Sequence, residues 1–299
     1  MDVLVTGGTV FVSRAVAEYF AARGDRVFVM NRGNRLQPKN TTLIRADRHC
    51  LTGELKSYCF DGIIDMTAYS ADDVRQLIRA LGGFKDYILL SSSAVYPETL
   101  AQPFREVQPV GPNRFWGSYG VGKIDAESEL LRLFPASYIL RPPYLCGKGN
   151  NLYREAFVFE CVERGIPVYL PGGTDLQLQF CCISELCKLI ERILVTKPAT
   201  HILNVGDPNT VSAEDWIQIC ANIANRQCEI CYANRDIPVR DYFPFRDYSY
   251  QLDVSDAIEI SPYSTTLSES LRSGHEWWTA HRDEVVRKPY IEYIASHFR

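Results

Sequence analysis

In the first half of the chain, short β-branched runs alternate with longer segments in which apolar residues recur every three or four positions. Runs of the first kind predict buried strands, and segments of the second kind predict amphipathic helices. The predicted strands are Val3–Val5, Val27–Met30, Leu43–Arg45, Gly62–Asp65, Tyr87–Leu90 and Ser137–Leu140. The helices predicted between them include Val12–Arg23, Ala71–Leu81 and Val121–Phe134. This alternation predicts right-handed βαβ units and an α/β fold with a doubly wound parallel sheet.

After Tyr144 this rhythm loosens, and the pattern predicts a smaller α+β region that closes over the carboxyl edge of the sheet. We expect helices at Tyr153–Arg164 and Ser184–Leu194, the second with Ser184 as N-cap, and strands at Ile166–Gly173 and Leu176–Ile183. Two later helices begin at Ser212-x-x-Asp215, a weak capping box, and Thr266-x-x-Glu269, a clear one. The predicted division is a nucleotide-binding domain at 1–145 and a mainly substrate-binding region at 146–299, with a strand or helix returning to the sheet.

The composition is that of a globular protein rather than a disordered one, with 46% hydrophobic and 23% charged residues. A net charge of -4 disfavours a nucleic-acid binder that works by neutralising phosphates. No apolar run reaches the roughly 18 residues that would cross a membrane. The chain opens directly with a predicted strand and lacks the features of a signal peptide, so we expect a cytoplasmic protein.

The ten cysteines are scattered along the chain, with one C-x-x-C at Cys228 and Cys231. A zinc site would need a second pair of cysteines or histidines at matching spacing nearby, and there is none. We therefore expect reduced thiols in the core and no metal.

The segment Thr6–Ser13, TGGTVFVS, lies between the first predicted strand and the first predicted helix. Glycines at this point let the backbone approach a pyrophosphate, which binds at the helix N-terminus, as in a Rossmann fold. A complete loop has three glycines at three-residue spacing, whereas this chain keeps Gly7 and has Val10 and Ser13 at the later two positions. The loop alone leaves open a glycine turn that binds no nucleotide.

The end of the second predicted strand bears on the type of cofactor. NAD enzymes usually place an acidic residue there, to accept hydrogen bonds from the ribose hydroxyls. This chain has Asn31, which can still bond a ribose hydroxyl, followed by Arg32 and Arg35, which could pair with a 2′-phosphate. The cofactor is therefore expected to be NAD or NADP, with a modest preference for NADP.

Tyr119 and Lys123 are four residues apart, so on a helix they stand one turn apart on the same face. An ammonium near a phenol lowers the pKa of the phenol, which would make Tyr119 a proton donor or acceptor near neutrality. Tyr-x-x-x-Lys alone is a weak motif, but here it follows the fifth predicted strand. That strand ends in Ser91–Tyr96, SSSAVY, whose hydroxyls lie at the edge where ligands bind.

Together these motifs resemble the extended short-chain dehydrogenase/reductases, the NAD-dependent epimerase/dehydratase family, over essentially the whole chain. The glycine loop with Asn31-Arg32-Gly33 is closer to an atypical branch of that family, which includes chloroplast stem-loop-binding-like proteins and bacterial epimerase homologues. The residues that carry the resemblance are TGGT at 6–9, SSSAVY at 91–96, Tyr119-x-x-x-Lys123, LRPP at 140–143, PGGT at 171–174, Gln179-Phe180, NVGD at 204–207 and FPFRD at 243–247.

The resemblance implies that Ser92 hydrogen-bonds the reacting hydroxyl or carbonyl, Tyr119 moves the proton, and Lys123 holds the nicotinamide ribose and tunes Tyr119. Strand-end packing accounts equally well for several of the implied cofactor contacts, those at 66–68 and 142–143. The implied cofactor residues are Gly7, Thr9, Val10, Phe11, Val12, Asn31, Arg32, Asp47, Arg48, Met66, Thr67, Ala68, Tyr119, Lys123, Pro142 and Pro143, and the implied substrate residues are Ser93, Tyr144 and Arg246.

This chain departs from the family pattern at several positions. These departures argue against one type of reaction and do not identify the substrate. Dehydratases carry an Asp-Glu pair where this chain has Ser93 and Ala94, so elimination of water is not expected. Sugar-nucleotide epimerases commonly have an arginine, which grips the diphosphate, where this chain has Leu178, and a family asparagine is replaced by Tyr144. Arg246 is either a substitute phosphate contact or a surface arginine.

The leading hypothesis is an NAD(P)-dependent epimerase or oxidoreductase acting on a hydroxyl carbon of a sugar or nucleotide sugar, such as a UDP-glucose 4-epimerase-like enzyme. The expected partner is this small molecule, with no membrane and no nucleic acid. Family members often pair through two helices per subunit, which suggests a homodimer through the helix after Tyr119. The alternative is a non-catalytic nucleotide-sensing or RNA-binding protein that retains the fold.

Overall fold

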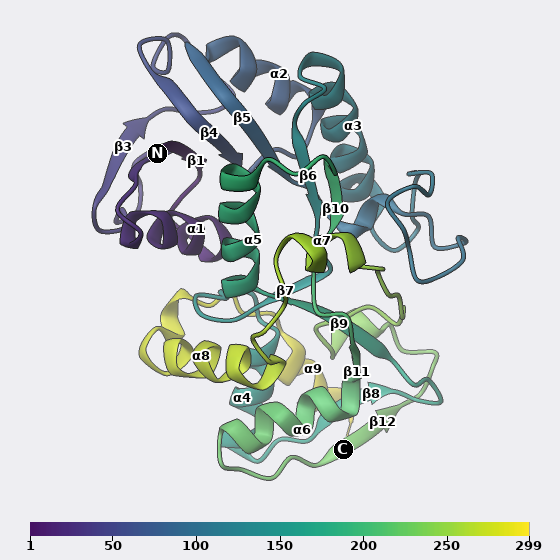
Figure 1. Cartoon of the computed structure of the whole chain (residues 1–299). Helices are drawn as coiled ribbons and strands as arrows, with labels where there is room; N and C mark the ends of the chain where they lie inside the picture. The colour runs from purple at the N-terminus through teal and green to yellow at the C-terminus, as the bar shows by residue number, and fades with distance from the viewer. Residues whose placement is uncertain (299) are drawn as a thin grey trace.

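The computed structural model describes residues 1–298, and its centre is a seven-stranded parallel sheet (Figure 1). The strands lie in the order β10-β6-β5-β4-β1-β2-β3. Strands are therefore added toward one edge from β1 to β3 and toward the other edge from β4 onward, and this order switches between β1 and β4. Ligands of doubly wound folds bind at such a switch point, beyond the carboxyl ends of the strands. The bounds are β1 (Asp2–Thr6), β2 (Arg26–Asn31), β3 (Thr41–Arg45), β4 (Cys59–Asp65), β5 (Gly83–Leu90), β6 (Tyr138–Arg141) and β10 (Ile202–Asn204).

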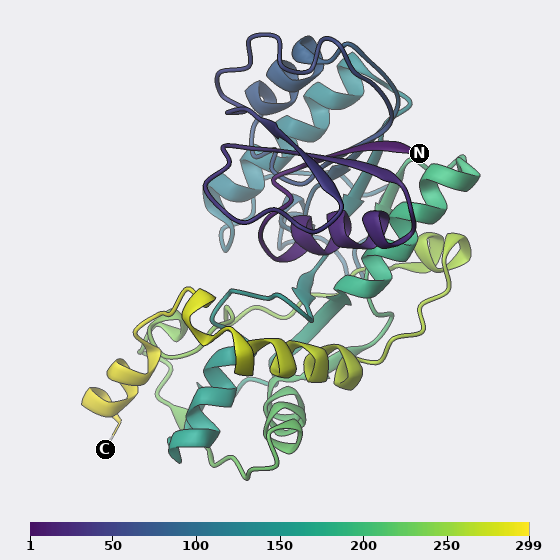
Figure 2. The same cartoon turned by 90° about the vertical axis from the view of Figure 1, so that its left-hand side faces the viewer.

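Helices cover both faces of this sheet, as Figure 2 shows edge-on. Successive residues of β1 point to opposite faces, so Val3 and Val5 belong to one buried cluster and Leu4 to another. Because both faces are buried, the strands read as continuous apolar runs rather than alternating ones. The covering helices are α1 (Phe11–Ala22) and α5 (Ile183–Thr196) on one face, and α2 (Ala71–Ala80) and α3 (Gly117–Leu133) on the other.

A second lobe lies beyond the carboxyl ends of the strands and has its own aromatic core around Trp216, Phe180 and Phe245 (Figure 1). Its strands form a three-stranded sheet, β11-β9-β7, and a parallel pair, β12-β8. The strand bounds are β7 (Tyr144–Cys146), β8 (Val168–Pro171), β9 (Gln177–Cys182), β11 (Thr210–Ser212) and β12 (Ile230–Ala233). The helix bounds are α4 (Glu155–Arg164), α6 (Ala213–Ile223), α7 (Ser255–Ile260), α8 (Leu267–Ala280) and α9 (Tyr290–His297), with short 3₁₀ turns at Ser93–Val95, Val239–Asp241 and Arg282–Glu284.

The parallel α/β sheet is confirmed, and the six strands predicted in the first half are all present. Residues after 146 also return to the first lobe, because β10 adds a seventh strand and α5 packs beside α1. The capping box at Thr266 and Glu269 is confirmed. The prediction of Ser184 as an N-cap is wrong: α5 begins one residue earlier, its N-cap is Cys182, and the Ser184 hydroxyl instead contacts the hydroxyl of Thr265 at 3.2 Å.

No helix among residues 1–298 is long and apolar enough to span a membrane. Nor do these residues contain a group of three or more His, Cys, Asp or Glu side chains placed to hold a metal ion.

Candidate active site

A cavity of about 450 Å³ lies at the carboxyl ends of the central strands, between the two lobes. It is bounded by the start of α1, the ends of β4, β5 and β6, and residues from α3 and the second lobe. Predicted site residues that meet there are Val10, Phe11, Val12, Met66, Thr67, Ser92, Ser93, Tyr119, Lys123, Pro142, Pro143 and Tyr144. Predicted site residues that lie up to 134 positions apart in the sequence, from Val10 to Tyr144, therefore share one cavity.

The loop between β1 and α1 needs glycine for steric reasons. Gly8 has φ +74°, and a Cβ at this position would lie 2.5 Å from Cγ1 of Val29. Ser13, in place of the third glycine, packs beside Gly7 and donates a hydrogen bond to the Val10 carbonyl at 3.0 Å. No side chain caps the start of α1, so the N–H groups of its first turn keep the capacity to bind an anion.

Phe11, the first residue of α1, adopts φ +38°, in the left-handed region that non-glycine residues rarely occupy. Such a conformation costs roughly 1–3 kcal/mol and persists only where the surroundings fix it. The Phe11 side chain is buried and its backbone faces Gly149 of the second lobe. The start of α1 therefore lies close to the second lobe.

Asp65, at the end of β4, is the centre of a buried polar network beside this loop. It accepts hydrogen bonds from Thr6 at 2.8 Å, Tyr87 at 2.7 Å and Arg48 at 2.9 and 3.1 Å. Burial alone would raise the pKa of Asp65, but the charge and hydrogen bonds of Arg48 outweigh it and lower the pKa to about 2. Arg48 also donates to Thr67 at 2.7 Å, so the network fixes the segment that lines the cavity after β4.

Lys123 and Tyr119 both come from α3 but differ in exposure. Lys123 is 2% exposed, and its ammonium donates hydrogen bonds to the carbonyls of Ala68 and Leu90, each at 2.8 Å. Burial lowers the pKa of Lys123 to about 8. Tyr119 is 41% exposed, and its ring centre lies 6.0 Å from the Lys123 nitrogen.

The pKa of Tyr119 is raised, because desolvation in the cleft outweighs the lowering effect of the nearby Ser92 hydroxyl. The prediction that Lys123 lowers this pKa is therefore wrong for the arrangement in this structure. The physical reason is that two backbone carbonyls hold the ammonium, and the cation whose charge acts on Tyr119 is Arg154. Arg154 was not predicted as a site residue from the sequence. The only feature that could have indicated it is a positive charge at the start of a mostly apolar helix.

Behind the cavity, an ion pair ties α3 to β6. Arg141 donates to Glu127 at 2.6 and 3.0 Å and to the Tyr96 hydroxyl at 2.8 Å, and Ser91 donates to the same carboxylate. Tyr96 in turn donates to Asn204 at 2.8 Å. All of these side chains are buried. Arg141 and Asn204 lie in two of the motifs that carry the family resemblance, and the structure gives them a framework role.

Aromatic rings form the wall of the cavity on the side of the second lobe. Tyr144 is 5% exposed, and its ring centre lies 5.9 Å from that of Tyr250 and 6.1 Å from that of Trp116. Ser93 donates a hydrogen bond to the Tyr250 hydroxyl at 3.0 Å. Arg246 does not line the cavity but lies against Trp116, with its guanidinium carbon 5.1 Å from the ring centre.

Comparison with known proteins decides the family. The model of the NAD dependent epimerase/dehydratase family matches residues 3–206, more than half of the chain. The chain belongs to this family. A relative from Arabidopsis thaliana, chloroplast stem-loop binding protein of 41 kDa b, is 25% identical over 281 residues, covering 86% of this chain and 73% of the relative.

Solved structures of similar fold include a UDP-glucose 4-epimerase and a dTDP-glucose 4,6-dehydratase. MoeE5 in complex with UDP-glucuronic acid and NAD is 20% identical, with a TM-score of 0.75, over 94% of this chain and 99% of that one. UDP-glucose 4-epimerase of Thermotoga maritima is 17% identical, with a TM-score of 0.75 and the same coverage. dTDP-glucose 4,6-dehydratase of Bacillus anthracis in complex with NAD is 14% identical, with a TM-score of 0.77, over 95% and 98% of the two chains. At these identities the likeness shows the fold alone.

Several residues that the family pattern assigned to the cofactor do not line the cavity: Gly7, Thr9, Asn31, Arg32, Asp47, Arg48 and Ala68. The Asn31 amide donates to the Gly7 carbonyl at 2.7 Å and accepts from the Gly33 N–H at 2.8 Å, so it braces the glycine loop. The Arg48 guanidinium is engaged by Asp65 and Asp73. Arg32 is exposed and forms no ion pair among residues 1–298, which leaves it available to an anion.

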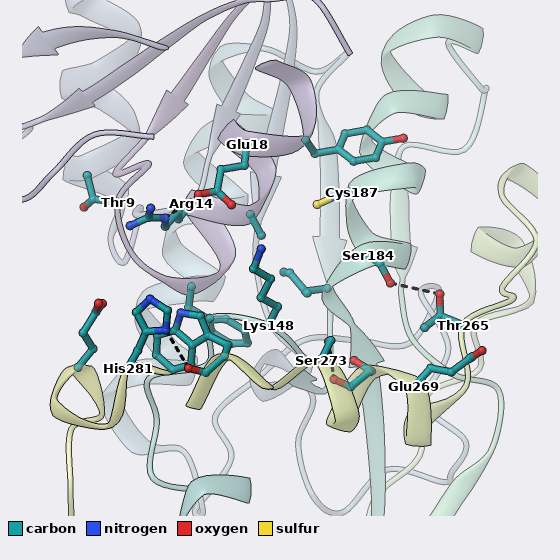
Figure 3. A pocket seen from close by; sticks show the side chains of 18 of the residues that line it. Thr9, Arg14, Glu18, Lys148, Ser184, Cys187, Thr265, Glu269, Ser273 and His281 are labelled. Carbon is teal, nitrogen blue, oxygen red and sulfur yellow. Dashed lines mark hydrogen bonds and ion pairs between the residues drawn. The ribbon is translucent and has the colours of Figure 1, made fainter. Parts of the chain in front are cut away.

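A larger cavity, of about 970 Å³, lies between α1, α5 and α8 (Figure 3). Phe11 lines both cavities, and Thr9 lines only the larger one. Lys148 extends into this space, and His281 faces it from the end of α8, stacked on Trp277 at 5.1 Å between ring centres. Of the residues that the family pattern assigned to the site, Thr9 and Phe11 line this cavity.

Proposed function

We propose that this protein is an NAD(P)-dependent epimerase or oxidoreductase that acts on a hydroxyl carbon of a sugar or nucleotide sugar. The observation that carries the proposal is one cavity that contains Ser92, Tyr119 and Lys123 beside the uncapped start of α1. The complexes of MoeE5 with UDP-glucuronic acid and with UDP-glucose, both with NAD, support nucleotide sugars as the first substrates to test.

The residues present fit a dinucleotide. The backbone at Gly8 is open to a close approach because no Cβ fits there, and the first N–H groups of α1 would hold the pyrophosphate. Lys123 would hold the nicotinamide ribose, and Arg32 would meet a 2′-phosphate if the cofactor is NADP. When bound, NAD or NADP supplies the acceptor and donor of the hydride.

The protein's own residues handle the proton. Ser92 Oγ would hydrogen-bond the substrate hydroxyl, and Tyr119 Oη would take its proton as the carbon is oxidised to a ketone, and return a proton on reduction. The raised pKa of Tyr119 means that the phenol must be stabilised as phenolate during turnover, and the nearby charges available for this are Arg154 and Lys123. Ser93 and Ala94 offer no carboxylate pair, which favours epimerisation or simple redox over dehydration.

The test is to incubate the protein with NAD+ or NADP+ and a panel of nucleotide sugars while following absorbance at the reduced-nicotinamide band. A stoichiometric rise means an oxidoreductase, and an isomeric product without a lasting rise means an epimerase. If neither appears across a broad panel, the proposal fails.

A second candidate function, binding of a nucleotide or of RNA without catalysis, is favoured by the larger cavity and by the name of the Arabidopsis relative. The cavity combines Arg14, Arg35 and Lys148 with an aromatic pair, as single-stranded nucleic-acid sites do. Three carboxylates in the same lining oppose it: Glu18, Glu269 and Glu284. RNA affinity with a steep salt dependence, without binding of either dinucleotide at millimolar concentration, would favour this candidate.

A further inference from the structure

Arg154 brings an unpaired positive charge into the cavity that contains Ser92 and Tyr119. It immediately precedes α4, and its guanidinium carbon lies 5.0 Å from the centre of the Tyr144 ring and 5.8 Å from that of Phe245. Among residues 1–298 no carboxylate lies within the 4.0 Å of an ion pair. The adjacent Glu155 is buried and accepts a hydrogen bond from Asn150 at 2.9 Å.

The donors of Arg154 are almost unused. A guanidinium has five N–H donors, and the side chain makes one long hydrogen bond, from Nη1 to the Leu145 carbonyl at 3.5 Å. The aromatic rings stabilise its charge but accept no strong hydrogen bond in its plane. Holding such a group partly buried without an acceptor is unfavourable, so the arrangement calls for a partner that the protein itself does not supply.

The neighbouring Tyr144 has the same need. Its hydroxyl is buried and forms no hydrogen bond of acceptable geometry, although the backbone N–H of Arg246 approaches it. That hydroxyl is enclosed, so the donor that lines the cavity at this wall is the guanidinium of Arg154, which lies over the Tyr144 ring. Planar bidentate pairing with a carboxylate or a phosphate is what arginine does best.

Arg154 lies at the end of the cavity that contains Ser92 and Tyr119, where we expect the reaction to take place. The charge of Arg154 acts on the hydroxyls of Tyr119, Tyr144 and Tyr250, which all line the same space. Arg246, in contrast, lies against Trp116 outside the lining and near Arg240. Of the two arginines, Arg154 is therefore the one that brings its charge into this cavity.

We propose that Arg154 binds an acidic group on the sugar that reacts, a carboxylate or a phosphate, so that the protein selects uronic acids or sugar phosphates over neutral sugars. The inference rests on the proposed function for the identity of the reacting group. Charge-assisted hydrogen bonds of this kind would orient the ring over Ser92 and Tyr119 as well as bind it.

The experiment measures binding and turnover in the presence of NAD+, with substrates in pairs that differ only in the acidic group. UDP-glucuronic acid against UDP-glucose, and glucuronate against glucose, test a carboxylate, and glucose 6-phosphate against glucose tests a phosphate. Affinities come from calorimetry and rates from product analysis. The variants are Arg154→Gln and Arg154→Lys, with Arg164→Gln as control, because Arg164 lies at the other end of α4 and pairs with Glu160 at 3.1 Å.

We expect the acidic member of at least one pair to bind about 10-fold or more tightly than its neutral partner. Arg154→Gln should remove most of that difference while changing the affinity for the neutral partner by less than about 3-fold, and Arg154→Lys should restore part of it. Arg164→Gln should change neither. The pair that shows the difference in affinity identifies whether Arg154 recognises a carboxylate or a phosphate.

The inference is overturned if no ligand binds, if the members of every pair bind equally, or if Arg154→Gln weakens both members alike. Its failure is distinguishable from that of the proposed function. Turnover of neutral and acidic sugars alike, with no preference between them that depends on Arg154, would uphold the proposed function and overturn the inference. An Arg154-dependent preference in binding without any hydride transfer would do the reverse.

Discussion

At the scale of single residues, the site depends on where charges are held rather than on which residues are present. Lys123 is buried between two carbonyls, and Asp65 is buried among four donors. Both groups have pKa values below their ordinary ones. The lowered pKa disfavours the charged form of Lys123 and favours the charged form of Asp65. Lys123 is easier to deprotonate, and Asp65 is harder to protonate.

Lys123 should make stability depend on pH in a defined window. Its pKa falls from 10.5 to about 8 on folding, so between these values the unfolded chain binds more protons and stability rises with pH. Lys123→Met removes this contribution. The free energy of unfolding of the wild type minus that of the variant, from urea denaturation, should therefore increase as the pH is raised from 8 to 10.5. A difference that stays flat would contradict the burial of this ammonium.

Asp65→Asn should destabilise the fold strongly, because it leaves the guanidinium of Arg48 buried with only Asp73 as a charged partner. Breaking a buried ion pair typically costs about 3–5 kcal/mol. The control is Asp72→Asn, whose carboxylate is 72% exposed and should contribute less than about 1 kcal/mol. Urea denaturation measures both changes, and similar small losses for the two variants would show that the Asp65 network is not structural.

At the scale of elements, the junction of β1 and α1 sets the shape of the nucleotide loop. Gly8→Ala would place a methyl group against Val29 and also strain a positive φ. Gly24→Ala is the matched control, because Gly24 has φ +92° with nothing within 4 Å of the added atom. We expect both variants to lose roughly 1–2 kcal/mol of stability through the backbone, and only Gly8→Ala to weaken NAD(P) binding as well. Calorimetric titration with each dinucleotide checks this, and unchanged affinity in Gly8→Ala would place the cofactor elsewhere.

The helices and strands of the first lobe, and their order, could be predicted from the sequence because their apolar residues recur at regular spacing over long segments. Strands of three residues such as β7 and β10 were not predicted, since their pairing depends on distant partners, Phe180–Cys182 for β7 and Ile139–Arg141 for β10. The start of α5 was placed one residue late, because a serine suggested a cap that the backbone does not use.

The motif residues of the candidate site were predictable from sequence, but their partners were not. Nothing in the sequence near Tyr119 indicates that Arg154, 35 positions later, shares its cavity. In the same way Arg48 was assigned to the cofactor, while the fold brings it to Asp65 and Asp73. Side-chain direction depends on tertiary contacts, which no local pattern encodes.

At the scale of the whole molecule, two lobes enclose two cavities that share Phe11. We propose that the dinucleotide binds in the smaller cavity, which leaves the larger one for other ligands. Hydrogen exchange with saturating NAD+ or NADP+ should therefore slow the amides around Gly7–Ser13, Met66–Ser70 and Ser91–Ser93. Slowing confined to α8, around Glu269–Ala280, would instead place the dinucleotide between α1 and α8.

The central claim is hydride chemistry at a sugar hydroxyl carbon with Tyr119 as the proton-transfer group. The most direct measurement is the turnover rate of wild type and Tyr119→Phe on the best substrate of the panel, with Tyr232→Phe, an exposed tyrosine, as control. We expect a loss of about 100-fold or more for Tyr119→Phe, as for removal of a general acid–base, with dinucleotide affinity retained and the control unaffected. A Tyr119→Phe variant that turns over at the wild-type rate would contradict this claim.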